Sequence, residues 1–224
     1  MKLSTGSLDF DGFLEGGYEK GAITAAYGPA SSGKTLLCFL AAISAAKEKK
    51  VIFIDAEGIS VERLKQLCDD EKIFENIMFL HPLTFEDQKR IFATLPKMIT
   101  PSLGLIVVDT ISMLYRIAHA SSQDYFDLNR ELSKQIGLLT EIARKQNIPV
   151  FLTSQVYADF EQKDKVNIVG GDILKYGAKC LIEIQPYRGN FRRAILRKHR
   201  SIGERELVYK IVQEGTTKVE QVNW

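Results

Sequence analysis

Five short runs of apolar residues, rich in β-branched side chains, have the pattern of buried strands. They are Ala22–Tyr27, Val51–Asp55, Ile77–Leu80, Leu105–Asp109 and Val150–Ser154. Longer segments with apolar residues at helical spacing alternate with them. These segments are Thr35–Lys49, Val61–Asp70, Phe85–Leu95 and Tyr125–Gln146. Strands that alternate with helices favour a mainly parallel sheet covered on both faces, so the pattern predicts an α/β fold.

The pattern changes after Gly177, where three consecutive runs have the pattern of strands joined by turns. They are Cys180–Gln185, Arg192–Arg197 and Leu207–Val212. Consecutive strands without intervening helices predict an antiparallel extension at one edge of the sheet. No long linker, repeat or low-complexity stretch divides the 224 residues, so we expect a single domain over residues 1–224.

The composition is that of an ordinary globular domain, with 45% apolar and 26% charged residues. The net charge of +2 says nothing about a nucleic-acid partner. The longest nearly apolar run, Leu36–Ala46, is shorter than the about 20 residues that cross a bilayer, and the N-terminus lacks a signal-peptide stretch. The three cysteines are far apart and lack metal-binding spacing, so we expect reduced thiols in a cytoplasmic protein without membrane association.

A glycine-rich segment, Gly28-Pro29-Ala30-Ser31-Ser32-Gly33-Lys34-Thr35, lies between the first predicted strand and the first predicted helix. It matches the P-loop pattern in the structural context that the pattern requires. Gly28 and Gly33 permit the backbone to bend around phosphates, and the loop N–H groups supply a positive dipole. Lys34 is expected to contact the β- and γ-phosphates and Thr35 to bind Mg²⁺. The segment therefore predicts a site for ATP and Mg²⁺.

Three further predicted strands end beside polar side chains that suit the same chemistry. Asp109 follows four apolar residues, as expected of a carboxylate that meets a magnesium ion, although many strands end in Asp as a turn residue. Glu57 could orient or deprotonate the attacking water, or could equally be a solvated loop acid. Gln155 could hydrogen-bond the γ-phosphate, although taken alone it is more simply a surface glutamine.

Together, the P-loop and these strand ends resemble the RecA/RadA recombinase family. The resemblance also covers Ser4–Asp9, Gly16-Gly17, Gly21–Thr24 and Gly170–Asp172, and thus nearly the whole chain. It implies a RecA-like P-loop ATPase core, with Glu57 as the catalytic glutamate and Asp109 as the magnesium-shell aspartate. It implies that Gln155 couples the γ-phosphate to the second DNA-binding loop. Arg63 lies in a segment that resembles the one whose arginine stacks on adenine, with a spacing from Glu57 one residue short.

Departures from the family pattern imply an accessory role. Full recombinases of this kind have an N-terminal helical DNA-binding domain and a polymerisation segment with a Phe-x-x-Ala motif, whereas this chain begins almost at the core. The segment that matches the second DNA loop, Tyr157–Val169, is short and acidic to neutral. We therefore expect an ATP-binding mediator that binds DNA, in single-stranded form, and the main RadA-like recombinase. ATP would act mainly as a regulatory ligand with weak hydrolysis, in a nucleoid-associated protein that could form a homodimer.

Two other functions compete with the mediator. Glu57 and Gln155 favour an active DNA-dependent ATPase or strand-exchange recombinase, but the short second loop and the missing N-terminal domain oppose it. The third function is that of a RecA-like ATPase outside recombination. The Ser4-Thr5-Gly6 entry and the Gly170-Gly171 segment oppose it.

Between Pro186 and Arg205 the sequence is strongly basic, and Glu204 is the one acidic residue within it. The basic residues are Arg188, Arg192, Arg193, Arg197, Lys198, Arg200 and Arg205, with His199 among them. Such a cluster is an electrostatic footprint for DNA phosphates, or alternatively a solvated edge that prevents sheet aggregation. In RecA itself, two lysines one residue apart on a late strand reach the ATP of a neighbouring subunit. Lys198 and Arg200 have the same spacing, so we expect them to share a strand face and to act on DNA, on nucleotide in trans, or on both.

Overall fold

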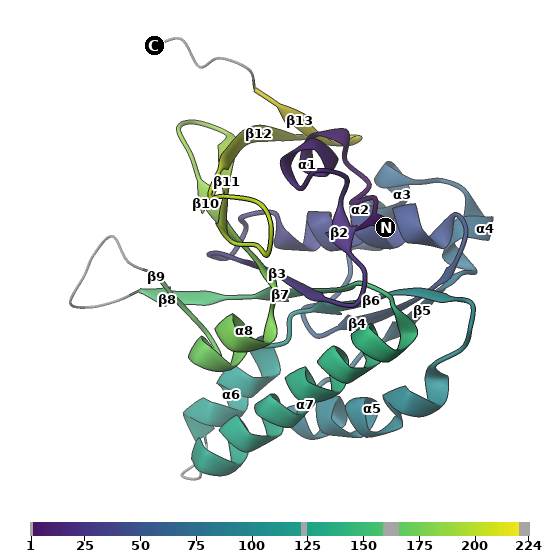
Figure 1. The fold of residues 1–224 in the computed structure, drawn as a ribbon, viewed down its shortest axis with the longest axis vertical. Helices are drawn as coiled ribbons and strands as arrows, with labels where there is room; N and C mark the ends of the chain where they lie inside the picture. The colour runs from purple at the N-terminus through teal and green to yellow at the C-terminus, as the bar shows by residue number, and fades with distance from the viewer. Residues whose placement is uncertain (1, 122–124, 159–165, 220–224) are drawn as a thin grey trace.

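The computed structural model describes residues 2–121, 125–158 and 166–219 (Figure 1). Its centre is a nine-stranded sheet with the strand order β13-β12-β11-β10-β3-β7-β6-β4-β5. In chain order these strands are β3 (Ile23–Tyr27), β4 (Lys50–Asp55), β5 (Ile77–Leu80), β6 (Leu103–Asp109), β7 (Val150–Ser154), β10 (Cys180–Pro186), β11 (Phe191–Lys198), β12 (Glu206–Val212) and β13 (Gly215–Lys218). Two small antiparallel pairs lie outside this sheet: β1 (Lys2–Leu3) with β2 (Tyr18–Glu19), and β8 (Val156–Ala158) with β9 (Val166–Ile168).

Strand direction divides the large sheet into two parts. From β10 through β3, β7, β6 and β4 to β5, neighbouring strands are parallel. From β10 through β11 and β12 to β13, they are antiparallel and follow one another directly in sequence. The predicted α/β fold with an antiparallel C-terminal extension is therefore confirmed.

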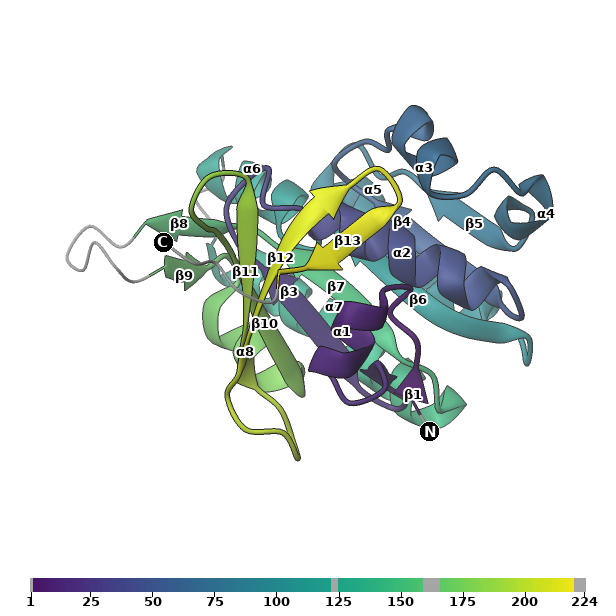
Figure 2. The ribbon, with the colours of Figure 1, turned by 90° about the horizontal axis from the view of Figure 1, so that it is seen from above.

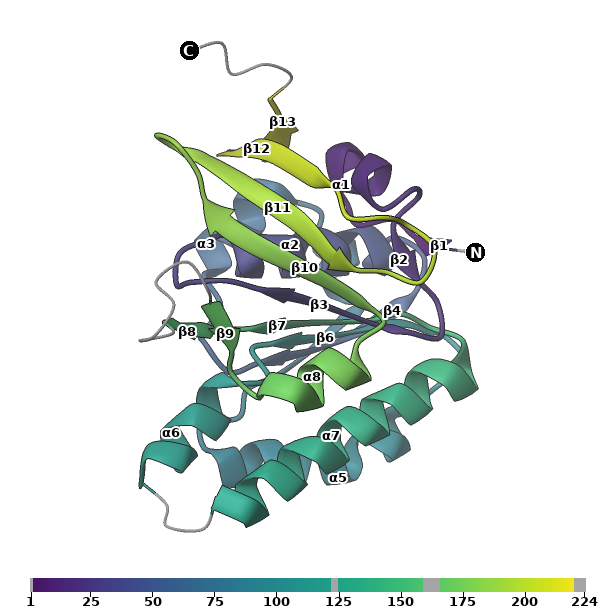
Figure 3. The same ribbon diagram turned by 60° about the vertical axis from the view of Figure 1, so that its left-hand side comes forward.

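Helices cover both faces of the parallel part of the sheet (Figures 1 and 3). One layer contains α2 (Lys34–Ala46), α3 (Val61–Leu67) and α4 (Glu71–Phe74), and the other contains α5 (Phe85–Met98), α6 (Met113–Ser121), α7 (Tyr125–Gln146) and α8 (Gly171–Gly177). On the side of α2, α1 (Leu8–Phe13) packs against the antiparallel strands β12 and β13. Each layer has its own apolar core. Phe151 belongs to the core beneath α2, whereas its neighbour Leu152 belongs to the core beneath α7. Successive strand side chains point to opposite faces, so one strand supplies both cores.

Helix α2 is buried on almost every side, which explains the long apolar run in its sequence. It crosses the sheet next to β12 and β13 in the view from above (Figure 2). Its neighbours therefore include the sheet, the other helices of its layer and the late strands. By contrast, α7 has a polar face, and none of the helices that the structure describes is long and apolar enough to cross a membrane.

Several predicted element boundaries differ from the structure for local reasons. Helix α3 ends at Leu67, because Asp70 instead caps α4 by accepting a hydrogen bond from the Lys72 N–H. Helix α5 continues past Leu95 to Met98 and includes Pro96. Helix α2 ends at Ala46, three residues before the predicted end, and α6 and α8 were not predicted. Much of the predicted second DNA loop, residues 159–165, lies outside the described residues, and its flanks form β8 and β9.

The register of the central strands brings their carboxyl ends to one edge of the sheet. Asp55 of β4 is the Cα partner of Asp109 of β6, and Tyr27 of β3 is the partner of Ser154 of β7. The segments that follow these strands carry the P-loop, Glu57 and Gln155. The predicted site residues therefore converge although they come from distant parts of the sequence.

Candidate nucleotide-binding site

The P-loop connects β3 to α2, and two of its glycines are required by neighbouring strands. A Cβ on Gly28 would lie 2.2 Å from the carbonyl oxygen of Ile184 in β10. Gly33 has φ of +97°, and a Cβ there would also meet the Ile211 side chain of β12 at 2.8 Å. A larger residue at Gly28 would push the loop away from β10, whereas at Gly33 the positive φ is the stricter requirement, because the end of the Ile211 side chain can move. The glycines thus permit a close approach of backbone to backbone as well as a left-handed turn.

Lys34 lies at the first position of α2 with a buried side chain. Its ammonium donates hydrogen bonds to the carbonyl oxygens of Gly28 (3.1 Å) and Pro29 (2.8 Å). Burial lowers the pKa of Lys34, and the nearby charges of Glu57 and Asp109 oppose this shift. The ammonium therefore lies inside the loop, in the position from which a P-loop lysine reaches bound phosphates.

Asp109 is buried at the end of β6 and accepts hydrogen bonds from the hydroxyls of Thr153 and Thr35. Burial raises the pKa of its carboxyl from 3.8 to about 6, against the effect of these hydrogen bonds, and the charges of Glu57 and Asp55 add to the rise. Because Thr35 and Asp109 are already in contact, their oxygens suit a Mg²⁺ ion, which prefers oxygen ligands. The positive charge of such an ion would favour the ionised carboxylate.

Glu57 and Gln155 are in direct contact although they are 98 positions apart in sequence. The Gln155 side-chain amide donates to Oε1 of Glu57 at 2.7 Å. Oδ1 of Asp55 holds the Glu57 loop by accepting from the N–H groups of Glu57 (3.2 Å) and Gly58 (2.9 Å). Oδ2 of Asp55 contacts Nδ1 of His81 at 3.1 Å. The carboxylate of Glu57 is thus oriented by a second, buried carboxylate.

Gln155 also lies at the junction between the sheet and the β8–β9 hairpin. Its backbone N–H donates to the Ser112 hydroxyl at 3.1 Å, and its carbonyl accepts from the Val169 N–H at 3.0 Å. The Ser154 hydroxyl donates to the same serine oxygen at 3.1 Å. A movement of the Gln155 side chain can therefore be transmitted both to the sheet and to the β8–β9 hairpin.

Sequence reasoning missed Thr153, Ser112 and Asp55 as supports of this site. Thr153 and Asp55 each lie two positions before a predicted site residue, Gln155 and Glu57 respectively. This position at a strand end was a usable signal. Ser112 follows β6 and has no comparable signal, because its partners lie more than 40 positions away.

Arg63 lies on α3, and its guanidinium contacts the turn between β12 and β13. It donates to the carbonyl oxygens of Val212 (2.7 Å) and Gln213 (2.9 Å), and to the side chain of Gln66. These hydrogen bonds use the edge of a planar group, and stacking on a base uses its face. The adenine-stacking role implied by the resemblance remains a prediction.

The side chains of the basic segment lie in several different environments. Arg192 donates to the carbonyl oxygen of Ser31 in the P-loop at 3.3 Å. The other arginines face acidic or polar partners: Arg193 contacts Gln185 and Glu206, Arg197 contacts Glu183 and Glu204, Arg200 contacts Glu19, and Arg205 contacts Glu15. Arg188 lies in the exposed turn between β10 and β11. Within the segment Glu204 is the one acidic residue, but the fold brings further carboxylates to these arginines from other elements.

Lys198 and Arg200 do not share a strand face, because β11 ends at Lys198. The Lys198 ammonium donates to the carbonyl oxygens of Lys175 (2.6 Å) and Ala178 (2.8 Å) at the end of α8. Lys198 pairs with Leu181 near the start of β10, whereas Arg192 pairs with Pro186 at its end. The buried ring of His199 accepts hydrogen bonds from two following backbone N–H groups. Lys198 is thus at the end of the sheet opposite the P-loop, which removes the geometric reason for pairing it with Arg200.

A groove of about 800 Å³ lies between α6, α7, α8 and the β8–β9 hairpin. Its lining combines aromatic and basic side chains, among them Tyr115, Phe126, Tyr157, Arg116, His119 and Arg130. Phe126 is 90% exposed and Tyr157 is 52% exposed. Exposed aromatic rings beside arginines suit stacking with nucleic-acid bases. Sequence reasoning missed this groove, although an exposed aromatic residue in the first turn of a helix is a recognisable signal.

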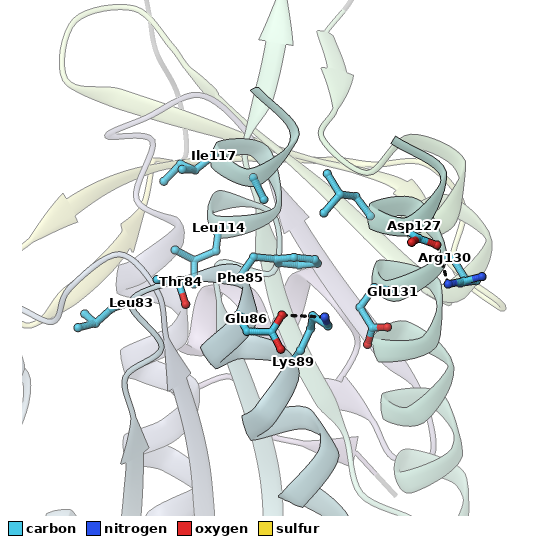
Figure 4. Close-up of a pocket in the computed structure, with 12 residues that line it drawn as sticks. Leu83, Thr84, Phe85, Glu86, Lys89, Leu114, Ile117, Asp127, Arg130 and Glu131 are labelled. Carbon is cyan, nitrogen blue, oxygen red and sulfur yellow. Dashed lines mark hydrogen bonds and ion pairs between the residues drawn. The ribbon is translucent and has the colours of Figure 1, made fainter. Parts of the chain in front are cut away.

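Another pocket, of about 460 Å³, lies between α5, α6 and α7 (Figure 4). Apolar side chains including Leu83, Leu114 and Ile117 line it, and ion pairs lie at its rim. These pairs join Glu86 to Lys89 (2.8 Å) and Asp127 to Arg130 (2.6 Å). None of the strand-end residues lines this pocket, so it is separate from the phosphate chemistry.

Comparisons with known proteins agree with this geometry. The sequence profile of the Rad51 family matches residues 1–219. The DNA repair and recombination protein RadB of Methanobrevibacter smithii is 39% identical, over 96% of this chain and 94% of that protein. The protein of the same name from Methanococcoides burtonii is 38% identical, over 89% of this chain and 90% of its own. A crystal structure of the RadB recombinase has a TM-score of 0.84 and 33% identity, covering 97% of this chain and 100% of that one.

The substitution Asp109→Asn should stabilise the nucleotide-free protein at neutral pH and lose this advantage in acid. The folded state binds a proton at Asp109 more tightly than the unfolded chain, because the pKa is raised from 3.8 to about 6. The stability of the native protein therefore falls as pH rises through this window, and Asn avoids the loss. Two pKa units correspond to an upper limit of about 3 kcal/mol. Urea denaturation of both proteins at about pH 4 and pH 7.5 measures the difference, and a difference independent of pH would contradict this account.

Proposed function

Because this chain belongs to the Rad51 family and has a RecA-like fold, we propose that it is an ATP-binding accessory protein of DNA repair and homologous recombination. In this role it binds single-stranded DNA and the main RadA-like recombinase, with ATP as a regulatory ligand that it hydrolyses weakly. The observation that carries the proposal is the convergence of Lys34, Asp109, Glu57 and Gln155 at one edge of the sheet. The similarity to archaeal RadB proteins along nearly the whole chain supports it.

Residues in and beside the P-loop have separate roles in binding ATP and Mg²⁺. Lys34 exchanges its hydrogen bonds with the loop carbonyls for bonds to phosphate oxygens. Thr35 and Asp109 would hold the Mg²⁺ ion, which would supply positive charge next to the phosphates. The buried position of Asp109 makes this step sensitive to its protonation, since the neutral carboxyl is a poor ligand.

Glu57 is the candidate general base, and its contact with Gln155 supports slow hydrolysis. The Gln155 amide occupies Oε1 of Glu57, the kind of oxygen that would accept a proton from water. Gln155 also leads into β8, so a ligand that moves the hairpin can release or restrain the base. This arrangement suits a protein in which the bound nucleotide mainly controls the conformation of the β8–β9 hairpin and is hydrolysed slowly.

Two surfaces support DNA binding. The groove beside the β8–β9 hairpin offers Phe126, Tyr157 and Arg116 to unstacked bases. The basic segment offers positive charge at the antiparallel edge, although ion pairs within the chain offset much of it. We assign base stacking to the groove and phosphate contact to the basic segment. Such a protein acts in the cytoplasm at the nucleoid, as a monomer or a homodimer.

A second candidate is an active DNA-dependent ATPase with strand-exchange activity, which the presence of both Glu57 and Gln155 favours. Phosphate release with and without single-stranded DNA separates it from a mediator. A RecA-like ATPase outside recombination is tested by retention of the main recombinase on the immobilised protein. A pull-down from native extract, with and without ATP, addresses both partner and nucleotide dependence.

Lys34→Ala should abolish useful ATP binding and any ATP-dependent retention of the recombinase. The Lys34 ammonium lies inside the loop, whereas Arg192 contacts the loop at the Ser31 carbonyl, and the fold should survive because the lysine contributes little apolar packing. Equilibrium binding of a fluorescent ATP analogue measures the loss. Unchanged affinity would remove the P-loop assignment.

Glu57→Gln should preserve ATP binding and remove most of the residual hydrolysis. Loss of a general base lowers the rate by about 10²–10⁴. Phosphate release at saturating ATP measures it, with Glu71→Gln, an exposed position in α4, as a control that keeps the native rate. Hydrolysis by the Glu57→Gln protein at the native rate would show that another group is the base.

Binding of single-stranded DNA should weaken steeply with salt, by about 0.7 in log affinity per phosphate contact for each log unit of salt. Arg116→Ala with Phe126→Ala should lower affinity at every salt concentration, because base stacking contributes about 1–3 kcal/mol per base. Lys198→Ala with Arg200→Ala should reduce the salt slope, because both residues carry charge in the basic segment although they do not share a strand face. Anisotropy of a labelled oligonucleotide measures both. A flat salt response in the native protein, or native affinity in both variants, would exclude these surfaces.

A further inference from the structure

Three late strands form one wall of the P-loop. The Ile184 carbonyl of β10 lies against Gly28, and the Ile211 side chain of β12 lies against Gly33. Between these contacts, Arg192 of β11 reaches Ser31, which is 161 positions away in sequence. The first two contacts are with glycines and leave no room for other side chains. The third is a hydrogen bond and is therefore the one that can act on the conformation of the loop.

Arg192 links the start of β11 to the middle of the loop. Its NH1 group donates to the carbonyl of Phe191 at 3.0 Å, and NH2 donates to the carbonyl of Ser31 at 3.3 Å. Its Nε is buried and has no hydrogen-bond partner among the described residues. Arg192 pairs with Tyr209, whose side chain is fully buried in the core beneath α2. The stem of the arginine is thus fixed by a rigid strand while its planar end spans two carbonyls.

Ser31 needs such a support because its backbone is in the left-handed region. Its φ is +59°, and it is an exposed serine rather than a glycine. For a residue with a Cβ, this conformation carries a free-energy cost, because the Cβ comes close to the following carbonyl oxygen. A hydrogen bond to its carbonyl contributes a stabilising free energy of similar magnitude, and more when the donor is charged. The two quantities are of the same size, so the arginine can decide whether the loop keeps its bent form without nucleotide.

We propose that Arg192 is a positioning residue for phosphate binding, which holds Ser31 in its left-handed conformation and so keeps the P-loop shaped for phosphates. The inference rests on the proposed ATP binding at this loop. Arginine suits the role because two separate nitrogens of its planar fork reach the carbonyls of Phe191 and Ser31, whereas a lysine would have to contact both from one nitrogen. One member of the predicted DNA-binding segment is thereby assigned to the nucleotide site of its own chain.

Arg192→Ala should weaken binding of a fluorescent ATP analogue by about three- to tenfold, the equivalent of one hydrogen bond. In the nucleotide-free protein, amide exchange of the peptide that contains the P-loop should become faster. Arg192→Lys should restore neither property fully, because it keeps the charge but not the double contact. Lys210→Ala serves as the control, since this exposed lysine pairs with Phe191 next to Arg192 and touches none of the loop. It should bind the analogue as the native protein does.

A second substitution tests whether Arg192 acts by supporting the Ser31 backbone or only through its charge. Ser31→Gly tolerates a positive φ without support, so adding it to Arg192→Ala should recover most of the lost affinity. Native affinity and native exchange in Arg192→Ala would overturn the positioning role, as would full recovery by Arg192→Lys or no recovery by Ser31→Gly. Failure of the native protein itself to bind the analogue would instead overturn the proposed ATP site, and this role with it.

Discussion

The parallel pairing of β3, β4, β6 and β7 is the constraint on which the rest of the molecule depends. These strands are buried on both faces, so a slip of one residue would exchange the side chains of the two cores. The register that satisfies both cores also sets Asp55 beside Asp109 and Tyr27 beside Ser154. Burial then opposes the charge of Asp109, and the hydroxyls of Thr35 and Thr153 offset part of that cost. Packing and chemistry are therefore fixed by the same pairing.

The antiparallel strands form part of the candidate nucleotide-binding site as well as extending the sheet. Their ends touch the P-loop, and the turn between β12 and β13 holds Arg63 on α3. The β12–β13 hairpin thus connects the P-loop, where the phosphates of ATP are expected, with Arg63, where the adenine is expected. On the other side, Gln155 connects Glu57 to β8. A bound nucleotide would lie between two hairpins that extend towards different surfaces of the protein.

The sequence was sufficient for features that depend on local spacing. Lys34 and Thr35 follow from a contiguous motif, and the central strands follow from apolar runs whose ends carry Asp109, Glu57 and Gln155. It was insufficient where distant segments meet. Nothing around Arg192 indicates that it reaches Ser31, and nothing around Arg197 or Arg200 indicates their partners Glu183 and Glu19. The expected alternation of Lys198 and Arg200 failed for a different reason, because the strand shifts register opposite Leu181 and then ends. The length of a strand depends on its pairing with neighbouring strands, and the sequence of one strand alone does not show this pairing.

The wall of late strands around the P-loop has a consequence for a chain during its synthesis. The P-loop ends at Thr35, but its wall is supplied by residues 184 to 211, which are translated much later. The wall of the P-loop is therefore complete only after the residues up to Ile211 have been synthesised. Contacts at such large sequence separation form late in folding because the intervening chain must first be ordered. Nascent or prematurely terminated chains would carry the P-loop motif without its wall, and ATP would thus favour completed molecules over fragments.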